Sequence, residues 1–280
     1  MRLVCDSGST KTDWIIAAQS SVITRFSTRG LNPSVMGTDR VGTTLQTDLL
    51  PHLEGLEVTD VEFYGAGCTP DICPEMQHLL ANLIPTARHI LVASDVLGAA
   101  KAVCGNQRGI AAILGTGANS CLFDGVKIVQ NTPALGFILG DEGSGAVLGR
   151  LFLNALLKGL LPDSITKTFS EETGLTQKDI IEKVYRTAAP NRFLASMSPF
   201  IHRHLAVSEL EGLVVTNFRD FFTHNIRQYG CPELPVNCVG SIAYFFSGQL
   251  REAAKLEGFT VGKILRTPID GLCAGCPPPI

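Results

Sequence analysis

Two short stretches rich in glycine, serine and threonine, each set between apolar runs, constrain the fold more than any other feature of this chain. The first, Asp6–Thr12, lies between the apolar runs 3–5 and 14–18, and the second, Leu114–Ser120, lies between 109–114 and 119–123. Short apolar runs bounded by small polar residues are typical of β-strands joined by a turn, so each stretch predicts a hairpin. Because the arrangement occurs twice, it also predicts a duplicated architecture.

Strands and helices alternate along the rest of the chain. After a polar segment with a loop at Gly30–Pro33, strands are predicted at 61–65, 89–93 and 236–239, and helices at 41–53, 74–83, 143–161, within 165–189 and 193–229, and from 241 to about 258. This alternation indicates the α/β class.

The length of 280 residues, of which 45% are hydrophobic, predicts more than one core. We expect an N-terminal lobe over residues 1–104, a second lobe over 105–262, and a C-terminal segment over 263–280 that returns to the N-terminal lobe and ends in a disordered tail. The default place for a ligand would be a cleft between the lobes.

Charge and hydropathy argue against several kinds of partner. The formal net charge is −3 and no dense Lys/Arg block is present, so we expect no nucleic-acid partner. The first five residues lead directly to Asp6, which leaves no room for a signal peptide, and no apolar run approaches the ~20 residues that a membrane helix needs. The sequence therefore predicts a cytoplasmic protein without a membrane segment.

Nine cysteines raise the question of redox or metal chemistry. Most of them stand among apolar residues, so we expect free, buried thiols in a reducing compartment. Only Cys273 and Cys276 have ligand-like spacing, and a single pair cannot complete a four-ligand zinc site within the chain.

The first predicted turn has the chemistry of a phosphate site. Gly8 allows a ligand to approach the backbone, Ser9 and Thr10 offer hydrogen-bond donors, and Lys11 follows them. Asp6, at the end of a strand, suits a Mg²⁺ ion held through water. A plain hairpin with a polar turn would explain the same residues.

Two further stretches could contact a nucleotide. Gly115, Thr116 and Gly117 form a second small-residue turn, which is not a Walker loop because no Gly-Lys-Ser/Thr follows. Two such hairpins facing one another would hold a triphosphate. Gly240 and Ser241 lie where a strand meets a helix, and an adenine ring could rest there, although tight strand–helix packing explains the glycine equally well.

The order of these motifs, Asp6-x-Gly-x-Thr10, Leu114-Gly-Thr-Gly117 and Val239-Gly-Ser-x-Ala243, resembles that of the actin, sugar kinase and Hsp70 superfamily. Within it the chain is most similar to BadF/BadG-type ATPases and N-acetylglucosamine kinases, from Asp6 to Gly271. The resemblance implies two ribonuclease-H-like lobes around a central nucleotide cleft, with ATP and Mg²⁺ bound there. The first two motifs would contact the phosphates and the third the adenosine.

The resemblance also implies residues for a sugar acceptor. Asp95 follows an apolar strand, where an Asp most simply caps a helix, but the matching Asp of the kinases is the base for the acceptor hydroxyl. Asp141, in the sequence Gly-Asp-Glu-Gly-Ser, matches a sugar-binding Asp, although carboxylates before a helix also favour its N-terminus. Asn32 matches a sugar contact, and Gly117, Ala118 and Asn119 would line the acetyl side.

The resemblance has one departure that concerns specificity. Animal kinases carry Gly-Trp-Gly ahead of the Gly-Asp-Glu-Gly-Ser element, whereas this chain has Ala134-Leu135-Gly136-Phe137. We expect a kinase for N-acetylglucosamine or a related amino sugar, and the family suggests a homodimer. Two alternatives stay open: an ATPase that activates a partner enzyme through a cysteine-ligated iron–sulfur cluster, and a sugar sensor without turnover.

Overall fold

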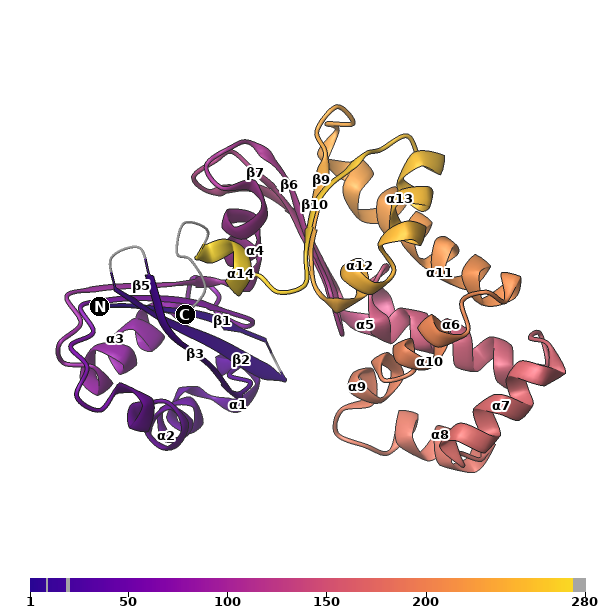
Figure 1. Ribbon diagram of the computed structural model, residues 1–280, viewed down its shortest axis with the longest axis horizontal. Coiled ribbons are helices and arrows are strands. Elements are labelled where there is room, and N and C mark those ends of the chain that lie inside the picture. Colours follow the sequence, from indigo (N-terminus) through magenta and orange to yellow (C-terminus); the bar gives the residue numbers. More distant parts are fainter. Residues whose placement is uncertain (9, 19–20, 274–280) are drawn as a thin grey trace. The chain divides into compact units, whose positions relative to one another are not determined.

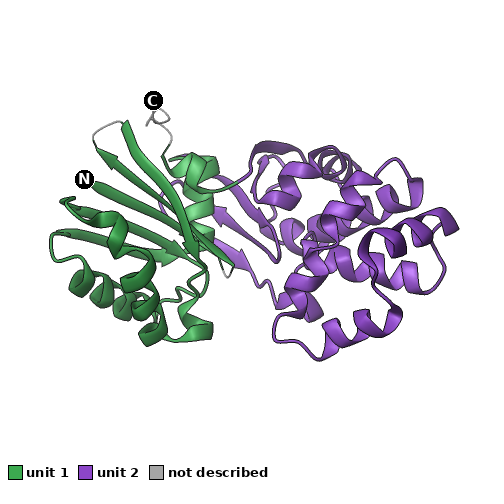
Figure 2. Ribbon diagram, turned by 60° about the horizontal axis from the view of Figure 1, so that its bottom comes forward, with its two compact units in different colours: residues 1–106, 267–280 green, residues 107–266 purple. Residues whose placement is uncertain are grey.

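The computed structural model describes residues 1–8, 10–18 and 21–273. The chain forms two compact units (Figure 2). Unit 1 contains Met1–Asn106 together with the C-terminal segment from Thr267, and unit 2 contains Gln107–Arg266. Each unit is built on its own five-stranded mixed sheet.

The sheet of unit 1 has the order β3-β2-β1-β4-β5 (Figure 1). Strands β1 (Arg2–Ser7), β2 (Lys11–Ala18) and β3 (Ser21–Arg29) are antiparallel, while β4 (Asp60–Gly65) and β5 (His89–Ser94) run parallel to β1. The predicted first hairpin is therefore confirmed. The prediction of a polar connection after it was wrong, because Ser21–Arg29 is an edge strand whose side chains are mostly exposed or half-buried.

Helices cover both faces of this sheet (Figure 1). Alternate strand residues such as Leu3, Trp14 and Phe63 pack with helices α2 (Thr38–Asp48) and α3 (Cys73–Leu83), whereas Val4 and Ile15 pack with Ile269 of α14 (Ile269–Leu272). The remaining helices are α1 (Pro33–Met36), a 3-10 helix at Leu50–Leu53 and α4 (Asp95–Cys104).

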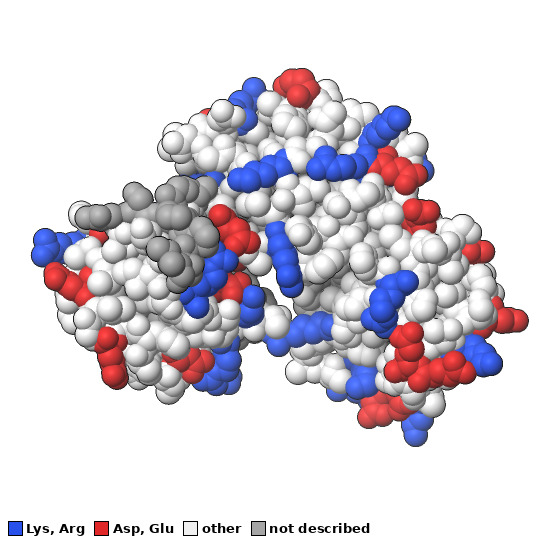
Figure 3. Space-filling view, in the orientation of Figure 1, with Lys and Arg blue, Asp and Glu red and all other residues white. Residues whose placement is uncertain are grey.

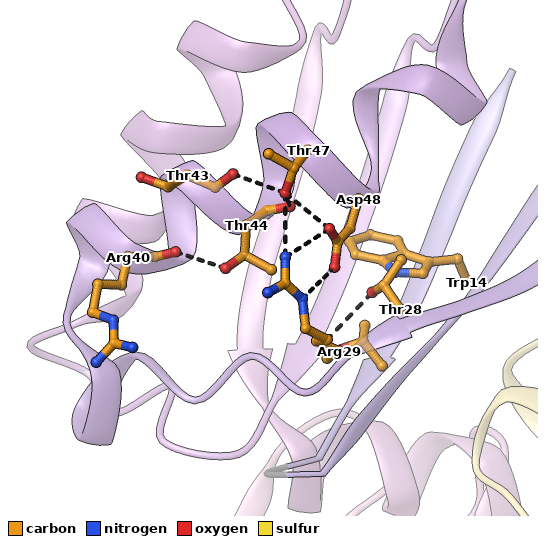
Figure 4. A network of polar contacts seen from close by, with 9 residues as sticks. Trp14, Thr28, Arg29, Arg40, Thr43, Thr44, Thr47 and Asp48 are labelled. Atoms are coloured by element: carbon orange, nitrogen blue, oxygen red, sulfur yellow. Dashed lines mark hydrogen bonds and ion pairs between the residues drawn. The ribbon is translucent and has the colours of Figure 1, made fainter.

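A polar network ties the end of β3 to the end of α2 (Figure 4). The Arg29 guanidinium donates two hydrogen bonds of 2.8 Å to the carboxylate of Asp48, from Nε to Oδ2 and from Nη2 to Oδ1. The indole Nε1 of Trp14 donates to Thr28 Oγ1 at 2.8 Å in the same region. This two-pronged contact fixes the point at which the chain leaves the sheet toward the Gly30–Pro33 loop.

The sheet of unit 2 has the order β10-β9-β6-β7-β8. Its strands are β6 (Gly109–Leu114), β7 (Ala118–Phe123) and β8 (Ile128–Thr132), which are antiparallel, and β9 (Val236–Val239) and β10 (Val261–Leu265), which are parallel to β6. This is the same strand topology as in unit 1, so the predicted duplication is confirmed. The two units are ribonuclease-H-like and give the α/β class that the sequence predicts.

The helices of unit 2 are shorter than the sequence pattern indicates. They are α5 (Gly136–Leu139), α6 (Gly145–Leu157), α7 (Asp163–Thr173), α8 (Gln177–Tyr185), α9 (Pro190–Ala195), α10 (Ser198–Arg203), α11 (Ser208–Phe221), α12 (Ser241–Phe245) and α13 (Ser247–Leu256), with a π-helical turn at Phe222–Ile226 and a 3-10 turn at Arg227–Tyr229. The predicted helical stretch 165–189 divides because left-handed Gly174 ends α7 and a capping box of Thr176 and Asp179 starts α8.

Surface charge is mixed on the face drawn in Figure 3, where Lys, Arg, Asp and Glu side chains lie singly or in small groups among uncharged residues. Within the described part of the chain, every helix is too short or too polar to cross a bilayer.

Candidate functional site

The first predicted phosphate turn joins β1 to β2. The amide of Gly8 donates to Lys11 O at 3.0 Å and closes the turn, Thr10 and Lys11 are exposed, and Lys11 Nζ pairs with Asp13 Oδ2 at 2.8 Å. A Cβ at Gly8 would meet only Lys11 O at an ordinary 3.5 Å, so packing within the chain does not require this glycine. Ser9 lies outside the described residues.

Two hydroxyls beneath this turn fix the loop that carries Asn32. Ser7 Oγ and Thr12 Oγ1 are 2.8 Å apart, and Ser7 Oγ both donates to Leu31 O at 2.9 Å and accepts from Leu31 N at 3.2 Å. These buried contacts hold the residue before Asn32 against the hairpin. Sequence reasoning missed Ser7, because a single serine in a strand shows no pattern.

Asn32 also packs against the loop after β4. Gly67 has a φ of +78°, and a Cβ there would overlap Asn32 Oδ1. Ser34 Oγ donates to Gly67 O at 2.7 Å on the same loop. Both the backbone conformation and the space therefore require glycine at position 67, and they leave room for the Asn32 side chain.

Asp95 is the first residue of α4. The cap of this helix is Ser94, whose Oγ accepts from Leu97 N at 3.3 Å, so the simpler alternative for Asp95, that it only caps the helix, does not hold. Asp95 Oδ1 instead accepts from its neighbour, Val96 N, at 2.9 Å. The carboxylate is thus available for a role other than capping.

Asp6 and Asp95 lie at the same edge of the sheet and influence each other. The parallel register aligns Ser7 of β1 with Gly65 of β4, and Gly65 with Ser94 of β5, so Asp6 lies one residue before this row and Asp95 one residue after it. Burial, followed by the charges of Asp95 and Asp13, raises the pKa of Asp6 to about 7 against the opposing effect of Lys11. Burial raises the pKa of Asp95 to about 6, although backbone amides oppose this.

These two carboxylates therefore form a region of excess negative charge. A hard cation would relieve it, and a single carboxylate such as Asp6 suits Mg²⁺, which keeps most of its waters. Among the residues that the structure describes, no three His, Cys, Asp or Glu side chains form a group able to hold a metal. A Mg²⁺ ion at Asp6 would thus take most of its ligands from water and phosphate.

The second predicted phosphate turn, in unit 2, is braced by the start of α6. Gly115 N donates to Gly117 O at 3.0 Å within the turn, while Gly145 N and Ala146 N donate to Gly115 O at 2.8 Å and Thr116 O at 3.1 Å. The turn and the N-terminus of α6 are thereby one hydrogen-bonded structure.

Asp141 lies against this turn in a left-handed backbone conformation, with φ of +56°. Its carboxylate accepts from the Ala118 amide, and a Cβ at Gly117 would lie 3.1 Å from Asp141 Oδ2. Burial raises the pKa of Asp141 to about 6; the Ala118 amide opposes this and the charge of Glu142 adds to it. Gly117, Ala118 and Asp141 are thus brought together, while the Asn119 side chain accepts from Asn131 Nδ2 at 2.9 Å.

Gly240 and Ser241 join β9 to α12. Gly240 has a φ of +115°, and a Cβ there would overlap the carbonyl of Leu114. Packing thus accounts for this glycine, as the sequence already allowed. Ser241 is exposed, and the adjacent aromatic residues Tyr244 and Phe245 are 48% and 46% exposed.

Most of the cysteines that the structure describes are buried. Cys273 is buried in the α14 cluster, whereas Cys276 and the tail after residue 273 lie outside the described residues.

No protein-family model and no curated protein matches the chain. Solved structures do. A candidate N-acetylglucosamine kinase from Porphyromonas gingivalis is 47% identical, with 98% of both chains covered and a TM-score of 0.95. One from Chromobacterium violaceum is 18% identical, with 98% of both chains covered and a TM-score of 0.73. A ROK-family glucokinase from Streptomyces griseus, solved with glucose and AMPPNP, is 14% identical over 98% of this chain and 97% of that one, with a TM-score of 0.56.

The two distant structures share the fold alone. The identity of 47% to the Porphyromonas gingivalis protein, over nearly the full length of both chains, is much higher and shows that the two proteins belong to one family. The duplicated ribonuclease-H-like sheets agree with it. The chain therefore belongs to the actin-like ATPase superfamily, with a sugar-kinase-like fold, in the family of the Porphyromonas gingivalis protein.

Proposed function

We propose that this protein is an ATP-dependent kinase that phosphorylates a hydroxyl of N-acetylglucosamine or a related amino sugar. The observation that carries the proposal is Asp95, a half-buried carboxylate that is not used as a helix cap and has a pKa raised to about 6. Such a group is ionised at neutral pH yet basic enough to accept a proton. The 47% identity to a candidate N-acetylglucosamine kinase supports the choice of acceptor.

The proposed reaction assigns a proton and a phosphoryl group to named partners. Asp95 accepts the proton of the acceptor hydroxyl while that oxygen bonds to the γ-phosphorus of ATP and the bond to the β,γ-bridging oxygen breaks. The products are ADP and a sugar phosphate. Mg²⁺ would neutralise phosphate charge, and Asp6 is the carboxylate that would hold it through water.

The remaining residues divide between nucleotide and sugar. In this proposal the nucleotide is bound by the turn residues Gly8, Ser9, Thr10 and Lys11, by Gly115, Thr116 and Gly117, and by Gly240 and Ser241. The sugar contacts Asn32, Asp95 and Asp141, with Gly117, Ala118 and Asn119 along its acetyl group. Carboxylate and amide oxygens suit this task because each accepts hydrogen bonds from hydroxyls.

Sugar-dependent turnover tests the proposal directly. We expect Mg²⁺-dependent ADP release to rise when an amino sugar is present, because water should be a poor substitute for the acceptor. The measurement compares N-acetylglucosamine, N-acetylmannosamine, glucosamine, glucose and muramic derivatives. Equal ADP release with and without every sugar would favour the partner-activating ATPase, and sugar binding without ADP release would favour the sensor.

Asp95→Asn tests the catalytic base. The amide cannot accept the proton, so sugar phosphorylation should fall by about 10²–10⁴-fold while ATP affinity is unchanged. The matched control is Ser94→Ala, which removes the actual cap of α4 and should cost about 1 kcal/mol of stability while retaining phosphoryl transfer. Near-normal transfer by Asp95→Asn would exclude Asp95 as the base.

Asp6→Asn should stabilise the protein in the absence of nucleotide and Mg²⁺. The folded-state pKa of Asp6 is raised to about 7, so its contribution to stability is complete at low pH and is lost as the pH rises from about 4 to 7. Because Asp6 is partly exposed, we expect a gain of only about 1–3 kcal/mol in unfolding free energy at pH 8, vanishing near pH 4. Denaturant unfolding at both pH values, with exposed Asp71→Asn as control, measures it; an equal effect at pH 4 and 8 would contradict the assignment.

Sugar affinity should depend on pH through Asp141. Its pKa is about 6, so it is protonated at lower pH and then loses acceptor capacity for sugar hydroxyls. Affinity should fall between pH 7 and pH 5, and the fall should be shallower in Asp141→Asn, where Asp6 and Asp95 still titrate in this range but position 141 does not. Calorimetry without nucleotide measures both proteins, and identical slopes would remove Asp141 from the sugar site.

A further inference from the structure

The C-terminal end of α11 has an unusual geometry that the proposed reaction does not use. After Phe221 the helix continues into a π-helical turn at Phe222–Ile226. A π turn inserts one extra residue into a helix, and such turns often occur at functional sites. Here Phe222 and Ile226 stay in the core, while His224 and Asn225 both reach the side chain of Glu142.

Glu142 directly follows Asp141, and both of its carboxylate oxygens are engaged by the π turn. His224 Nδ1 lies 3.1 Å from Glu142 Oε1, and Asn225 Nδ2 donates to Glu142 Oε2 at 3.2 Å. Burial acts to raise the pKa of Glu142, but the hydrogen bonds from its own amide, Asn225 and His224 bring it below its ordinary value. Glu142 is therefore held as an anion in a fixed position.

About two helical turns before Asn225, Asn217 holds Gly143 and Ser144, the two residues that follow Glu142. It is fully buried in the apolar core of unit 2, where an amide without partners would be costly. Its Oδ1 accepts from Gly143 N at 3.0 Å, and its Nδ2 donates to Ser144 O at 3.2 Å. Both ends of the amide are thus used to bind the backbone of the turn after Asp141.

Asp141 needs such support because a left-handed conformation is unfavourable for any residue with a Cβ, by about 1 kcal/mol or more. We propose that α11 and its π turn act as a clamp on residues 142–144, in which Asn217 and Asn225 are positioning residues that orient Asp141 for the acceptor. The clamp rests on the proposed function in that the acceptor is a sugar. Asn217 and Asn225 touch neither Asp141 nor, in this proposal, the sugar.

Asn225→Ala is the principal test, and Thr223→Ala is its matched control. Thr223 lies on the same π turn, but its hydroxyl donates to the carbonyls of Arg219 and Asp220 rather than to Glu142. Loss of one hydrogen bond to the Glu142 carboxylate should raise the KM for the sugar about tenfold, while the KM for ATP stays within about twofold. Thr223→Ala should change neither constant.

Hydrogen exchange provides a readout that does not depend on turnover. The Gly143 amide should exchange faster in Asn217→Ala, and the segment 141–145 faster in Asn225→Ala, than in the wild type or Thr223→Ala. If buried Asn217→Ala does not fold, Asn225→Ala still decides the question.

The outcomes separate the clamp from the proposed function. A wild type that neither binds nor phosphorylates any sugar overturns the function, and faster exchange at 141–145 would then still support the clamp. With an active wild type, a sugar KM in Asn225→Ala no higher than in Thr223→Ala overturns the clamp. Equal increases in the KM for sugar and for ATP would also overturn it, because they indicate a general loss of structure.

Discussion

The parallel pairing of β1 with β4, and of β4 with β5, is the interaction on which the candidate site of unit 1 depends. β1 is the middle strand of its sheet. Leu3, Val4 and Cys5 are consecutive and all fully buried, so both faces of the strand are covered. Parallel neighbours end at the same edge, and the register then places Asp6 and Asp95 within one residue of a common row. Two carboxylates 89 positions apart in the chain thereby share an electrostatic environment, and the charge of Asp95 adds to the effect of burial, which is the larger cause, in raising the pKa of Asp6.

The three acidic residues proposed for the site all have raised pKa values: Asp6 near the end of β1, Asp95 at the start of α4, and Asp141 in the loop before α6. In the protein without ligands, burial raises the free energy of the ionised form of each carboxyl group relative to the neutral form. A molecule that brings positive charge or hydroxyl donors removes this cost on binding. Residues of binding sites commonly lower the stability of the protein without its ligand, and these three buried carboxylates fit that pattern.

Most strands of the two sheets could be predicted from the sequence, including the edge strand β5, whereas the three other edge strands could not. β1 contains the apolar run Leu3–Cys5, which is buried on both faces of the sheet, whereas the missed strands β3, β8 and β10 are edges with mostly exposed or half-buried side chains and hence no clear pattern. At the site, Ser94 and Asp95 are both good capping residues, so sequence alone could not decide which of the two caps α4. Asn217 was missed because a single amide residue in an apolar helix creates no periodic pattern in the sequence. The π turn was missed because one inserted residue only weakens the regular spacing of the apolar residues.

The residues proposed for the sugar occupy matching places in the duplicated fold, where the third strand leaves each sheet. Asn32 follows β3 and Asp141 follows β8. Each packs against a glycine whose Cβ would crowd it: Gly67 after β4 for Asn32, and Gly117 in the β6–β7 turn for Asp141. The two connections differ in what holds them from behind, which is the Arg29–Asp48 pair near Asn32 and the α11 clamp near Asp141. Duplication therefore accounts for the matching positions of Asn32 and Asp141, while the contacts that support the two connections differ.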